Sequence, residues 1–224
     1  GLDANKTDGF WLVFDFGGGT FDSALIKVEE GIMKVVDTEG DNHLGGKDID
    51  YAVVDKVIIP YLKKEFSIEN ILQDEVKKNI LRDAMKFFGE QAKIQLSFNE
   101  TYDILTDVGE IPGNDDEGGE FELDFTITRE DFKSAVGPIF QQAIDTCNEL
   151  IKRNNLKGSD LATILLVGGP TYSPLLRNML KEQISSNVNT NIDPMTAVAA
   201  GAALYASTRE IPIKFQNRDL AKIQ

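Results

Sequence analysis

The stretch Phe14-Asp15-Phe16-Gly17-Gly18-Gly19-Thr20-Phe21-Asp22 lies near the start of a sequence of 224 residues. An apolar run leads into its glycines from Trp11, and a second apolar run continues from them as far as Val28. Two such runs on either side of a short glycine turn are typical of a β-hairpin. After a second turn at Glu29-Glu30-Gly31, another apolar run covers 32–38. We therefore predict an antiparallel meander of three strands.

The hairpin is expected to bring two acidic side chains together. Counting outward from the turn places Asp15 opposite Asp22, and like charges that face each other on one sheet destabilise it. Bare glycine backbone beside them allows an anion to approach the N–H groups closely. We therefore predict a phosphate site with a divalent metal, which both acids hold through water, as hydrated magnesium prefers. The alternative is an ordinary glycine turn with solvated aspartates.

A second glycine turn, Gly168-Gly169-Pro170, follows an apolar strand predicted at 163–167 and precedes a helix predicted at 174–184. Open α/β sheets bind ligands at the carboxyl ends of their strands. Because both glycine turns follow apolar strands, they favour one shared nucleotide cleft. The alternative for the second turn is simple strand-to-helix geometry.

A helical block is predicted from about Asp74 to Leu96. Its apolar face is expected to contain Val76, Ile80, Ala84, Phe87, Phe88 and Ala92. Glu90, Lys93 and Ser97 recur at spacings of three and four, so they share one face that can offer hydrogen bonds to a ribose and a base. The alternative is the solvated side of an amphipathic helix.

The rest of the chain alternates strands and helices, which predicts an α/β layer. Thr128, with Asp131 three residues on, is an Asp variant of the capping box and starts a long helix. A helix is predicted from Asp48, and a hairpin is predicted from strands at 101–108 and 121–127 with an acidic, solvated tip at 113–119. A last helix is predicted to begin after Asp193, with Pro194 in its first turn.

Composition limits the classes of function. The chain has 23 Lys and Arg against 37 Asp and Glu, a net charge of −14 that argues against a nucleic-acid partner. One cysteine excludes an intramolecular disulfide, and the longest apolar runs are too short to predict a membrane span. Because no apolar signal segment is seen after Gly1, a reducing cytoplasm is expected.

Single residues of reactive type do not suggest further sites. His43 is the only histidine, and the sequence arranges no partners for a metal site or triad around it. Cys147 is in phase with apolar residues of the long helix, so we expect a small buried apolar residue. The acidic tip lacks the spaced oxygen ligands of a calcium loop.

Five blocks of the sequence resemble the DnaK-type seventy-kilodalton heat-shock chaperones, which belong to the actin-like ATPase superfamily. In chain order they are FDFGGGTFD (14–22), GDNHLGGKD (40–48), EQAKIQLS (90–97), LVGGPT (166–171) and DPMTAVAAGAA (193–203). The resemblance implies an α/β fold, an actin-like ATPase (ribonuclease H-like) lobe, and identifies the chain as the second lobe of the nucleotide-binding domain. It also favours the ligand-facing interpretation of Glu90, Lys93 and Ser97.

The resemblance further implies how the chain is divided. A larger subdomain would comprise 1–44 and 132–213, a smaller α+β subdomain, 45–131, would be inserted into it, and 214–224 would form a tail. The family's first lobe, with the other phosphate loop, would precede Gly1, and a substrate-binding domain would follow.

Carried over position by position, the resemblance implies roles for the site residues. The β- and γ-phosphates of ATP or ADP would be held by Gly17, Gly18, Gly19 and Thr20. Asp15 would lie near the attacking water and, with Asp22, would hold Mg²⁺ and monovalent cations such as K⁺, so the catalytic set is Asp15, Thr20 and Asp22. Adenosine would be held by Glu90, Lys93, Ser97, Gly168 and Gly169.

The implied function is ATP-driven protein folding, with unfolded clients, a J-domain co-chaperone and a nucleotide-exchange factor as partners. The isolated lobe is expected to have no useful turnover. The alternative is a nucleotide-binding co-chaperone or exchange-factor-like relative with little turnover. A cytoskeletal filament protein or sugar kinase shares the fold, but the five blocks disfavour both.

Several positions depart from the family pattern. Lys47 stands where many members have a glutamate, and Pro170 stands where a serine is usual. Tyr172 replaces an arginine that faces the adenosine, and Met195 replaces an acidic residue. Ile94 is similar to bacterial members. These changes leave the phosphate site in place, put the affinity for the base in doubt, and point to a divergent bacterial member.

Overall fold

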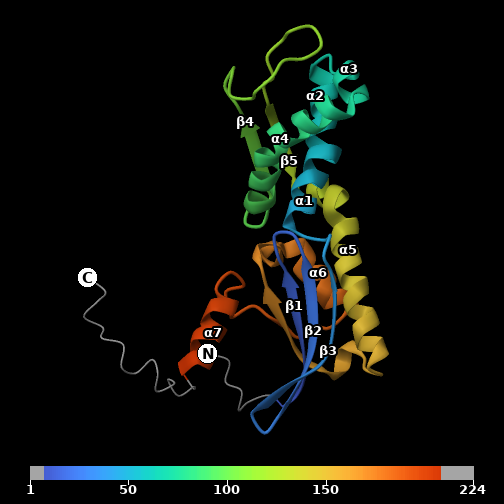
Figure 1. Ribbon diagram of the computed structural model, residues 1–224, viewed down its shortest axis with the longest axis vertical. Coiled ribbons are helices and arrows are strands. Elements are labelled where there is room, and N and C mark those ends of the chain that lie inside the picture. Colours follow the sequence, from blue (N-terminus) through green and yellow to red (C-terminus); the bar gives the residue numbers. More distant parts are fainter. Residues whose placement is uncertain (1–7, 208–224) are drawn as a thin grey trace, which may run out of the picture.

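The computed structural model describes residues 8–207, and the predicted tail at 214–224 lies outside them. Figure 1 shows an elongated molecule with a sheet at one end and, at the other, a group of helices with a small hairpin. The strands are β1 (Gly9–Phe16), β2 (Phe21–Glu29), β3 (Ile32–Asp41), β4 (Thr101–Leu105), β5 (Asp124–Thr128), β6 (Leu161–Val167) and β7 (Val188–Asn189). The α-helices are α1 (Gly46–Val53), α2 (Ile59–Glu65), α3 (Glu69–Gln73), α4 (Glu75–Leu96), α5 (Arg129–Arg153), α6 (Pro174–Gln183) and α7 (Ala197–Ser207).

The larger sheet is mixed and, within the described residues, has five strands in the order β3-β2-β1-β6-β7. The predicted meander is confirmed, because β1 pairs antiparallel with β2 and β2 with β3. The predicted register is confirmed too, with Asp15 opposite Asp22. β6 lies parallel to β1 on its other side, and Asp15 is also paired with Val167. The two glycine turns therefore leave neighbouring strands at the same edge of the sheet.

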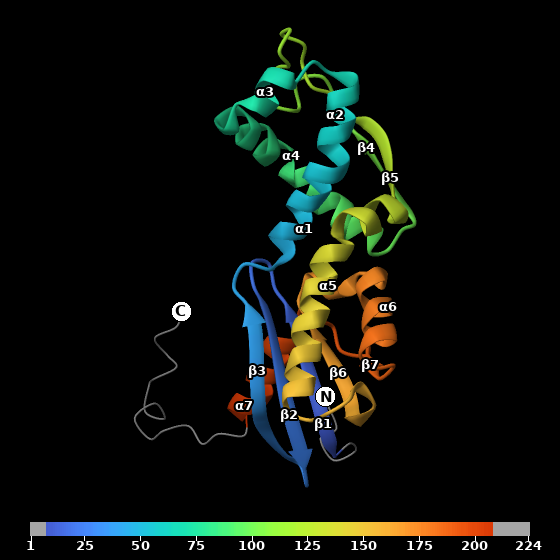
Figure 2. The same ribbon diagram turned by 90° about the vertical axis from the view of Figure 1, so that its right-hand side faces the viewer.

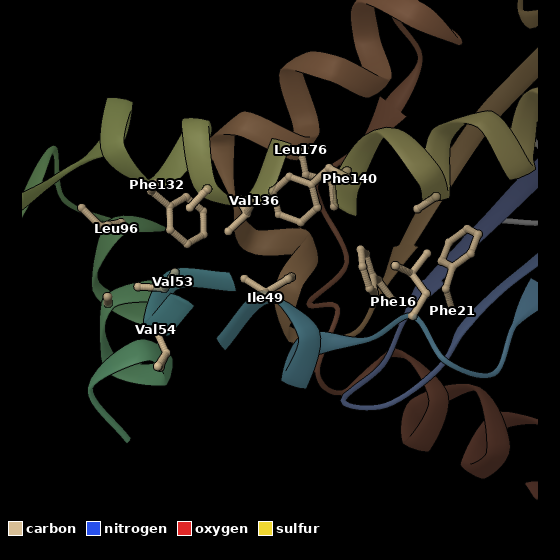
Figure 3. Packing of buried hydrophobic residues seen from close by; sticks show 14 of the residues in the cluster. Phe16, Phe21, Ile49, Val53, Val54, Leu96, Phe132, Val136, Phe140 and Leu176 are labelled. Carbon is tan, nitrogen blue, oxygen red and sulfur yellow. The ribbon is translucent and has the colours of Figure 1, made fainter. Parts of the chain in front are cut away.

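The core is continuous through both ends of the molecule. Phe14 and Phe16 of β1 are fully buried, and the Phe16 ring lies 6.0 Å from that of Phe140 on α5. Figure 3 shows Val136 and Phe132, nearer the N-terminal end of α5, beside Val53 of α1. Because α5 contributes to both ends, it joins the sheet to the helical part through buried apolar contacts.

Polar contacts fix both ends of α5. The predicted capping box is confirmed: the Thr128 N–H donates to Asp131 Oδ2 at 2.9 Å, and the Asp131 N–H donates to Thr128 Oγ1 at 3.2 Å. At the other end, Arg153 donates to Asp37 at 2.8 Å and to Glu39 at 2.6 Å, both on β3. The hydrogen bonds from Arg153 and Asn154 lower the pKa of Asp37 to about 2.

The helix predicted from Asp48 begins two residues earlier, at Gly46, and is interrupted. Between α1 and α2 lies a π-helical segment, η1 (Val54–Ile58), and the Ile59 N–H donates to the carbonyl of Val54 five residues back. Pro60 follows directly in α2. Proline has no N–H and its ring crowds the carbonyl four residues earlier, so the regular pattern of hydrogen bonds cannot pass through it.

The predicted apolar face of α4 is partly wrong. Val76, Ile80 and Phe87 are exposed to 69, 64 and 59 %, although Phe88 and Ala92 are buried as predicted. The buried residues of α4 are Leu81, Met85, Phe88, Gly89, Ala92 and Leu96. A Cβ on Gly89 would lie 2.5 Å from the carbonyl oxygen of Asp50, so α1 approaches this face closely. The exposed apolar residues and the buried apolar residues of α4 each recur at helical spacing, and the contact with α1 determines which set is buried.

The second hairpin also differs from its prediction. β4 pairs antiparallel with β5, which starts at Asp124 rather than at 121. The acidic tip is not simply solvated, because the Asp116 N–H donates to the carbonyl of Ser67 at 2.7 Å. The Asp116 carboxylate accepts from the Asn70 N–H, also at 2.7 Å. The second bond gives the Asn70 N–H, in the first turn of α3, its acceptor, so the Asp116 carboxylate acts as a cap.

The last helix is assigned from Ala197, later than predicted. The Asp193 carbonyl nevertheless accepts from the N–H groups of Thr196 and Ala197, so the chain turns helically from Pro194 onward. Figures 1 and 2 place α7 and α5 on opposite sides of the sheet. Among residues 8–207, no helix combines the length and the apolar character that crossing a membrane requires.

Candidate nucleotide site

The glycine turn of the β1–β2 hairpin is held through its carbonyl groups. The carbonyls of Gly17 and Gly18 accept from the N–H groups of Gly46 and Lys47 at 2.9 and 2.8 Å. The Gly17 N–H donates to the carbonyl of Thr20 at 2.9 Å. Within the described part of the chain, the N–H groups of Gly18 and Gly19 have no hydrogen-bond acceptor. The start of α1 thus fixes the turn while two N–H donors remain for an anion.

Two other glycines allow the loops to touch backbone to backbone. A Cβ on Gly45 would lie 2.5 Å from the Cα of Gly19, inside van der Waals contact. Gly168 has a φ of +89°, and a Cβ there would lie 2.0 Å from the carbonyl oxygen of Phe16. A side chain at either position would separate the loops. The three loops therefore form one assembly at the edge of the sheet.

This assembly borders a cavity of about 600 Å³. The predicted site residues that line it are Asp15, Gly17, Gly18, Glu90, Lys93, Ser97, Gly168 and Gly169. Further lining residues are Gly46, Ile94, Phe98, Val167, Pro170, Tyr172, Pro194, Met195 and Val198. Three predicted residues, Gly19, Thr20 and Asp22, are not part of this lining. The structure thus brings both glycine turns and the polar face of α4 around one space.

Asp15 and Asp22 line a second cavity, of about 560 Å³, together with Glu39 and Asn42. Burial, and then the nearby charge of Asp22, raise the pKa of Asp15. Asp15 also belongs to the first cavity, so it lies where the two spaces meet. The side chain of Thr20 is exposed at the turn beside them.

The two carboxylates fit a hydrated magnesium ion. Carboxylate oxygens are hard ligands, and Mg²⁺ keeps several waters while taking one or two carboxylates and phosphate oxygens. The described residues contain no group of three or more His, Cys, Asp or Glu side chains placed to hold a metal. A pair of acids beside an anion-binding turn suits Mg²⁺ that arrives with a phosphate, and the raised pKa of Asp15 reflects a carboxylate that a cation would stabilise.

Lys93 is held by a residue that the sequence analysis missed. Its ammonium lies 2.7 Å from Oδ1 of Asp50, and the two side chains are only 14 and 4 % exposed. The contact is close but poorly aligned, because Asp50 Oδ1 receives no well-directed hydrogen bond within the described residues. Burial raises the pKa of Asp50, and Lys93 opposes that effect. Asp50 lies on the buried side of α1, at the spacing of Gly46 and Val53, and this spacing was the signal available in the sequence.

The other polar residues of α4 are differently placed. Glu90 is exposed, and its Oε1 lies 4.0 Å from the ammonium of Lys93. The hydroxyl of Ser97 donates to the carbonyl of Lys93 at 2.9 Å. Phe98 also lines the cavity and was not predicted as a site residue. Its spacing of eight from Glu90, two helical steps of four, could have indicated it.

The prediction for Cys147 is confirmed. Cys147 is fully buried on α5, and its thiol donates to Ser23 Oγ at 3.3 Å. Burial raises the pKa of the Cys147 thiol to about 12, so it is not a reactive thiolate. His43 is an exposed loop residue whose N–H donates to Asp41 Oδ1 at 2.8 Å.

The sequence of the chain is similar to those of known proteins. The chain is 36 % identical over 208 residues to the chaperone protein DnaK of Nitrosopumilus maritimus (strain SCM1). The matched residues cover 92 % of the chain and 31 % of that protein. It is 34 % identical over 206 residues to the DnaK of Cenarchaeum symbiosum (strain A), covering 92 and 30 %. The DnaK of Thermosipho melanesiensis (strain DSM 12029 / CIP 104789 / BI429) is 33 % identical over 211 residues, covering 92 and 33 %.

The chain thus spans about a third of the length of these relatives. The family whose description is "Hsp70 protein" matches residues 1–217, almost the whole chain. The glycine hairpin, the second glycine turn and the polar face of α4, which meet around one cavity, all lie within this match. The chain therefore belongs to the Hsp70 family.

Proposed function

We propose that this chain is the second lobe of the nucleotide-binding domain of an Hsp70-type chaperone and that it binds ATP or ADP with Mg²⁺. One observation carries the proposal: the two glycine turns, Asp15 and the polar residues of α4 line a single cavity. Backbone N–H groups that can bind an anion and side chains that can form hydrogen bonds to a sugar, around one space, suit a nucleoside phosphate.

The phosphate end of the site would use the hairpin. The N–H groups of Gly18 and Gly19, which have no acceptor in the described residues, would donate to phosphate oxygens. The exposed hydroxyl of Thr20 would donate to the terminal phosphate. Asp15, at the junction of the two cavities, would accept a hydrogen bond from the attacking water.

Magnesium, when bound, would neutralise charge on the phosphates. Asp15 and Asp22 would hold it through water, and the fact that both acids line one cavity supports this role. A monovalent cation such as K⁺ would use the same carboxylates. Phosphoryl transfer of this kind depends mainly on positioning and on stabilisation of charge, which a fixed glycine turn supplies.

The sugar and base would lie toward α4 and the second glycine turn. Glu90 and Lys93 would bond the ribose hydroxyls, and Ser97 follows on the same helical face. Gly168 and Gly169 would let the backbone pass close under the nucleoside. The ion pair with Asp50 would keep Lys93 in place for this contact.

The whole protein would be an ATP-hydrolysing chaperone, since the relatives that the chain matches carry the name DnaK. Its proposed partners are unfolded client proteins, a J-domain co-chaperone and a nucleotide-exchange factor. The lobe would have the actin-like, ribonuclease H-like fold, with 45–131 inserted between 1–44 and 132–213. The cytoplasmic location, the bacterial origin and the lack of turnover by the isolated lobe stay predictions.

The test uses a glycine whose side chain would enter the proposed phosphate site. A Cβ on Gly18 would meet nothing within 4 Å, so Gly18→Ala should fold normally and occupy only the space over the turn. Calorimetric titration of the protein that carries this chain, at its natural length, should show Mg-ATP binding that Gly18→Ala weakens about tenfold or more. The matched control is Gly137→Ala, where a Cβ on α5 also meets nothing within 4 Å.

Equal ATP affinity in all three proteins would contradict the phosphate site. Turnover separates the two candidate classes of Hsp70 protein. ATP hydrolysis that unfolded peptide stimulates supports the chaperone, whereas tight ATP binding without turnover supports the co-chaperone alternative.

A further inference from the structure

An apolar stripe runs along the exposed side of α4. It consists of Val76, Ile80, Phe87 and Ile94, and Phe98 continues it two residues past the helix. Ile94 and Phe98 are exposed to 41 and 66 %, and the other three side chains are more than half exposed. Side chains four and seven residues apart lie on one side of an α-helix. These residues therefore form one line, which we call the outer stripe.

The outer stripe lies opposite the face through which α4 packs into its own molecule. The buried side chains of α4 centre on Met85, which lies half a turn away from Val76 because successive residues of an α-helix are about 100° apart. The exposure of the stripe shows that no element among residues 8–207 is packed over it. The helix therefore has one apolar face for the core and a second one that is open to a partner.

The size of the outer stripe sets the kind of partner it fits. Side chains of these sizes and exposed fractions leave on the order of 500 Å² of apolar surface in water, a patch large enough to mark an interaction surface. Two such surfaces, buried against each other, give on the order of 1,000 Å², which is the lower limit for a specific interface between proteins. An interface of this size suits a weak, reversible complex.

The spacing of the outer stripe is the same when read in either direction. Its intervals are 4, 7, 7 and 4 residues, with Phe87 at the centre. When a second α4 runs antiparallel with the two Phe87 side chains together, Ile80 faces Ile94 of the second copy, and Val76 faces Phe98. A two-fold dimer requires a surface that is complementary to itself. The spacing therefore fits a second copy of this chain.

The charged residues of α4 are compatible with this pairing. In the antiparallel register Asp83 faces Gln91 of the second copy, and Glu90 faces Ala84. From Glu75 to Leu96, no charged residue faces another of the same sign. The carboxylate of Asp83 also accepts a hydrogen bond from the Tyr51 hydroxyl at 2.6 Å, which holds it toward α1. The stripe can thus be covered without bringing like charges together.

We propose that the outer stripe is a dimerisation surface, on which a second copy of this chain docks its own α4 antiparallel about a two-fold axis at Phe87. The proposal does not depend on the proposed function. It has a consequence for the first cavity, because Phe98 lines that cavity. The dimer brings Val76 of the second copy to Phe98, so each copy adds an apolar side chain beside the cavity of the other.

The first experiment measures the oligomeric state of the protein that carries this chain, at its natural length. Sedimentation velocity should show a monomer–dimer equilibrium with a dissociation constant in the micromolar range. Phe87→Lys sets two ammonium groups against each other at the axis and should weaken the dimer at least tenfold. Because Phe87 is exposed, this variant should fold normally. The matched control is Val108→Lys, which changes an equally exposed apolar residue outside α4.

The second experiment tests the antiparallel register. Ile80→Glu combined with Ile94→Lys in one chain sets opposite charges against each other across the two-fold axis. Ile80→Lys combined with Ile94→Lys sets like charges there, and its dimer should be at least tenfold weaker than that of the first pair. Equal dimerisation by the two double variants would overturn the register and the proposal with it.

Two further results would overturn the dimer. One is a wild-type protein that stays monomeric up to about 100 µM, a concentration at which a micromolar dimer is largely formed. The other is a dimer that Phe87→Lys leaves as tight as Val108→Lys does. Neither measurement uses a nucleotide, so the dimer can fail while the proposed function stands, and the proposed function can fail while the dimer stands.

Discussion

The ammonium of Lys93 lies 2.7 Å from Oδ1 of Asp50 and joins α4 to α1 behind the first cavity. Both side chains are largely removed from water. A buried charge is costly without its partner, so each member of this pair depends on the other. The pair gives Lys93 two roles, one in stability and one in ligand binding.

Lys93→Met should lower the free energy of unfolding by about 3 kcal/mol, because it leaves the Asp50 carboxylate buried without a counter-charge. Chemical denaturation measures this loss. Adding Asp50→Asn to Lys93→Met removes the unpaired charge and should recover most of the stability. ATP affinity should remain low in the double variant, since the ammonium is still missing. Recovery of both properties would show that Lys93 acts only in folding.

Asp15 should make the protein less stable as pH rises. Its pKa is raised above 3.8 by burial and by Asp22, so the folded state binds the proton more tightly than the unfolded state. The free energy of unfolding therefore falls as pH rises from 3.8 through the raised pKa. Asp15→Asn should remove this fall and raise the stability at pH 7 by up to about 1 kcal/mol.

Thermal unfolding across the acid range checks this, with Asp124→Asn, an exposed acid of β5, as the control. The same Asp15→Asn substitution should weaken the effect of Mg²⁺ on ATP binding. A variant that is less stable than wild type at pH 7 would refute the conclusion that burial and Asp22 destabilise the ionised Asp15 carboxylate.

Lys47 should contribute to phosphate binding. Its Nζ would lie 3.9 Å from a Cβ on Gly19, beside the glycine turn. Lys47→Ala should weaken ATP binding about fivefold at low salt, and the effect should shrink as salt screens the charge. The exposed Lys63 of α2 provides the control substitution Lys63→Ala. An equal, small effect of both substitutions would mean that Lys47 adds only to the net charge.

Gly168 should not tolerate a side chain. A φ of +89° and a Cβ position 2.0 Å from the Phe16 carbonyl oxygen predict that Gly168→Ala loses at least about 2 kcal/mol of stability. Gly137→Ala, inside α5 with open space around its Cβ, should instead gain about 0.5 to 1 kcal/mol. Denaturant midpoints measured side by side decide the matter, and equal shifts for the two variants would speak against the close contact of the loops.

The sequence allowed prediction of those features that local rules determine. The register of Asp15 and Asp22 follows from counting outward from a tight turn, because a short turn leaves the strands no freedom to slip. The cap of α5 at Thr128 is equally local. The prediction that the glycine turns at Gly17 and Gly168 lie together required only that the two preceding strands end at the same edge of one sheet.

Features that depend on distant contacts escaped prediction. Phe87 was placed on the buried face of α4, but the close approach of α1 at Gly89 turned the opposite stripe inward. Asp50 was overlooked because its burial depends on how α1 meets α4. Phe98 had only its spacing from Glu90 as a signal in the sequence, and its contact with Tyr172, a residue far along the chain, became evident only in the structure.

The most direct test of the nucleotide site is a crystal structure of the protein with Mg²⁺ and ADP. We expect phosphate oxygens within hydrogen-bond distance of the Gly18 and Gly19 N–H groups. We also expect metal-bound waters within hydrogen-bond distance of the Asp15 and Asp22 carboxylates, and the ribose beside Lys93. A nucleotide bound elsewhere, with the hairpin turn free of any phosphate, would contradict the account.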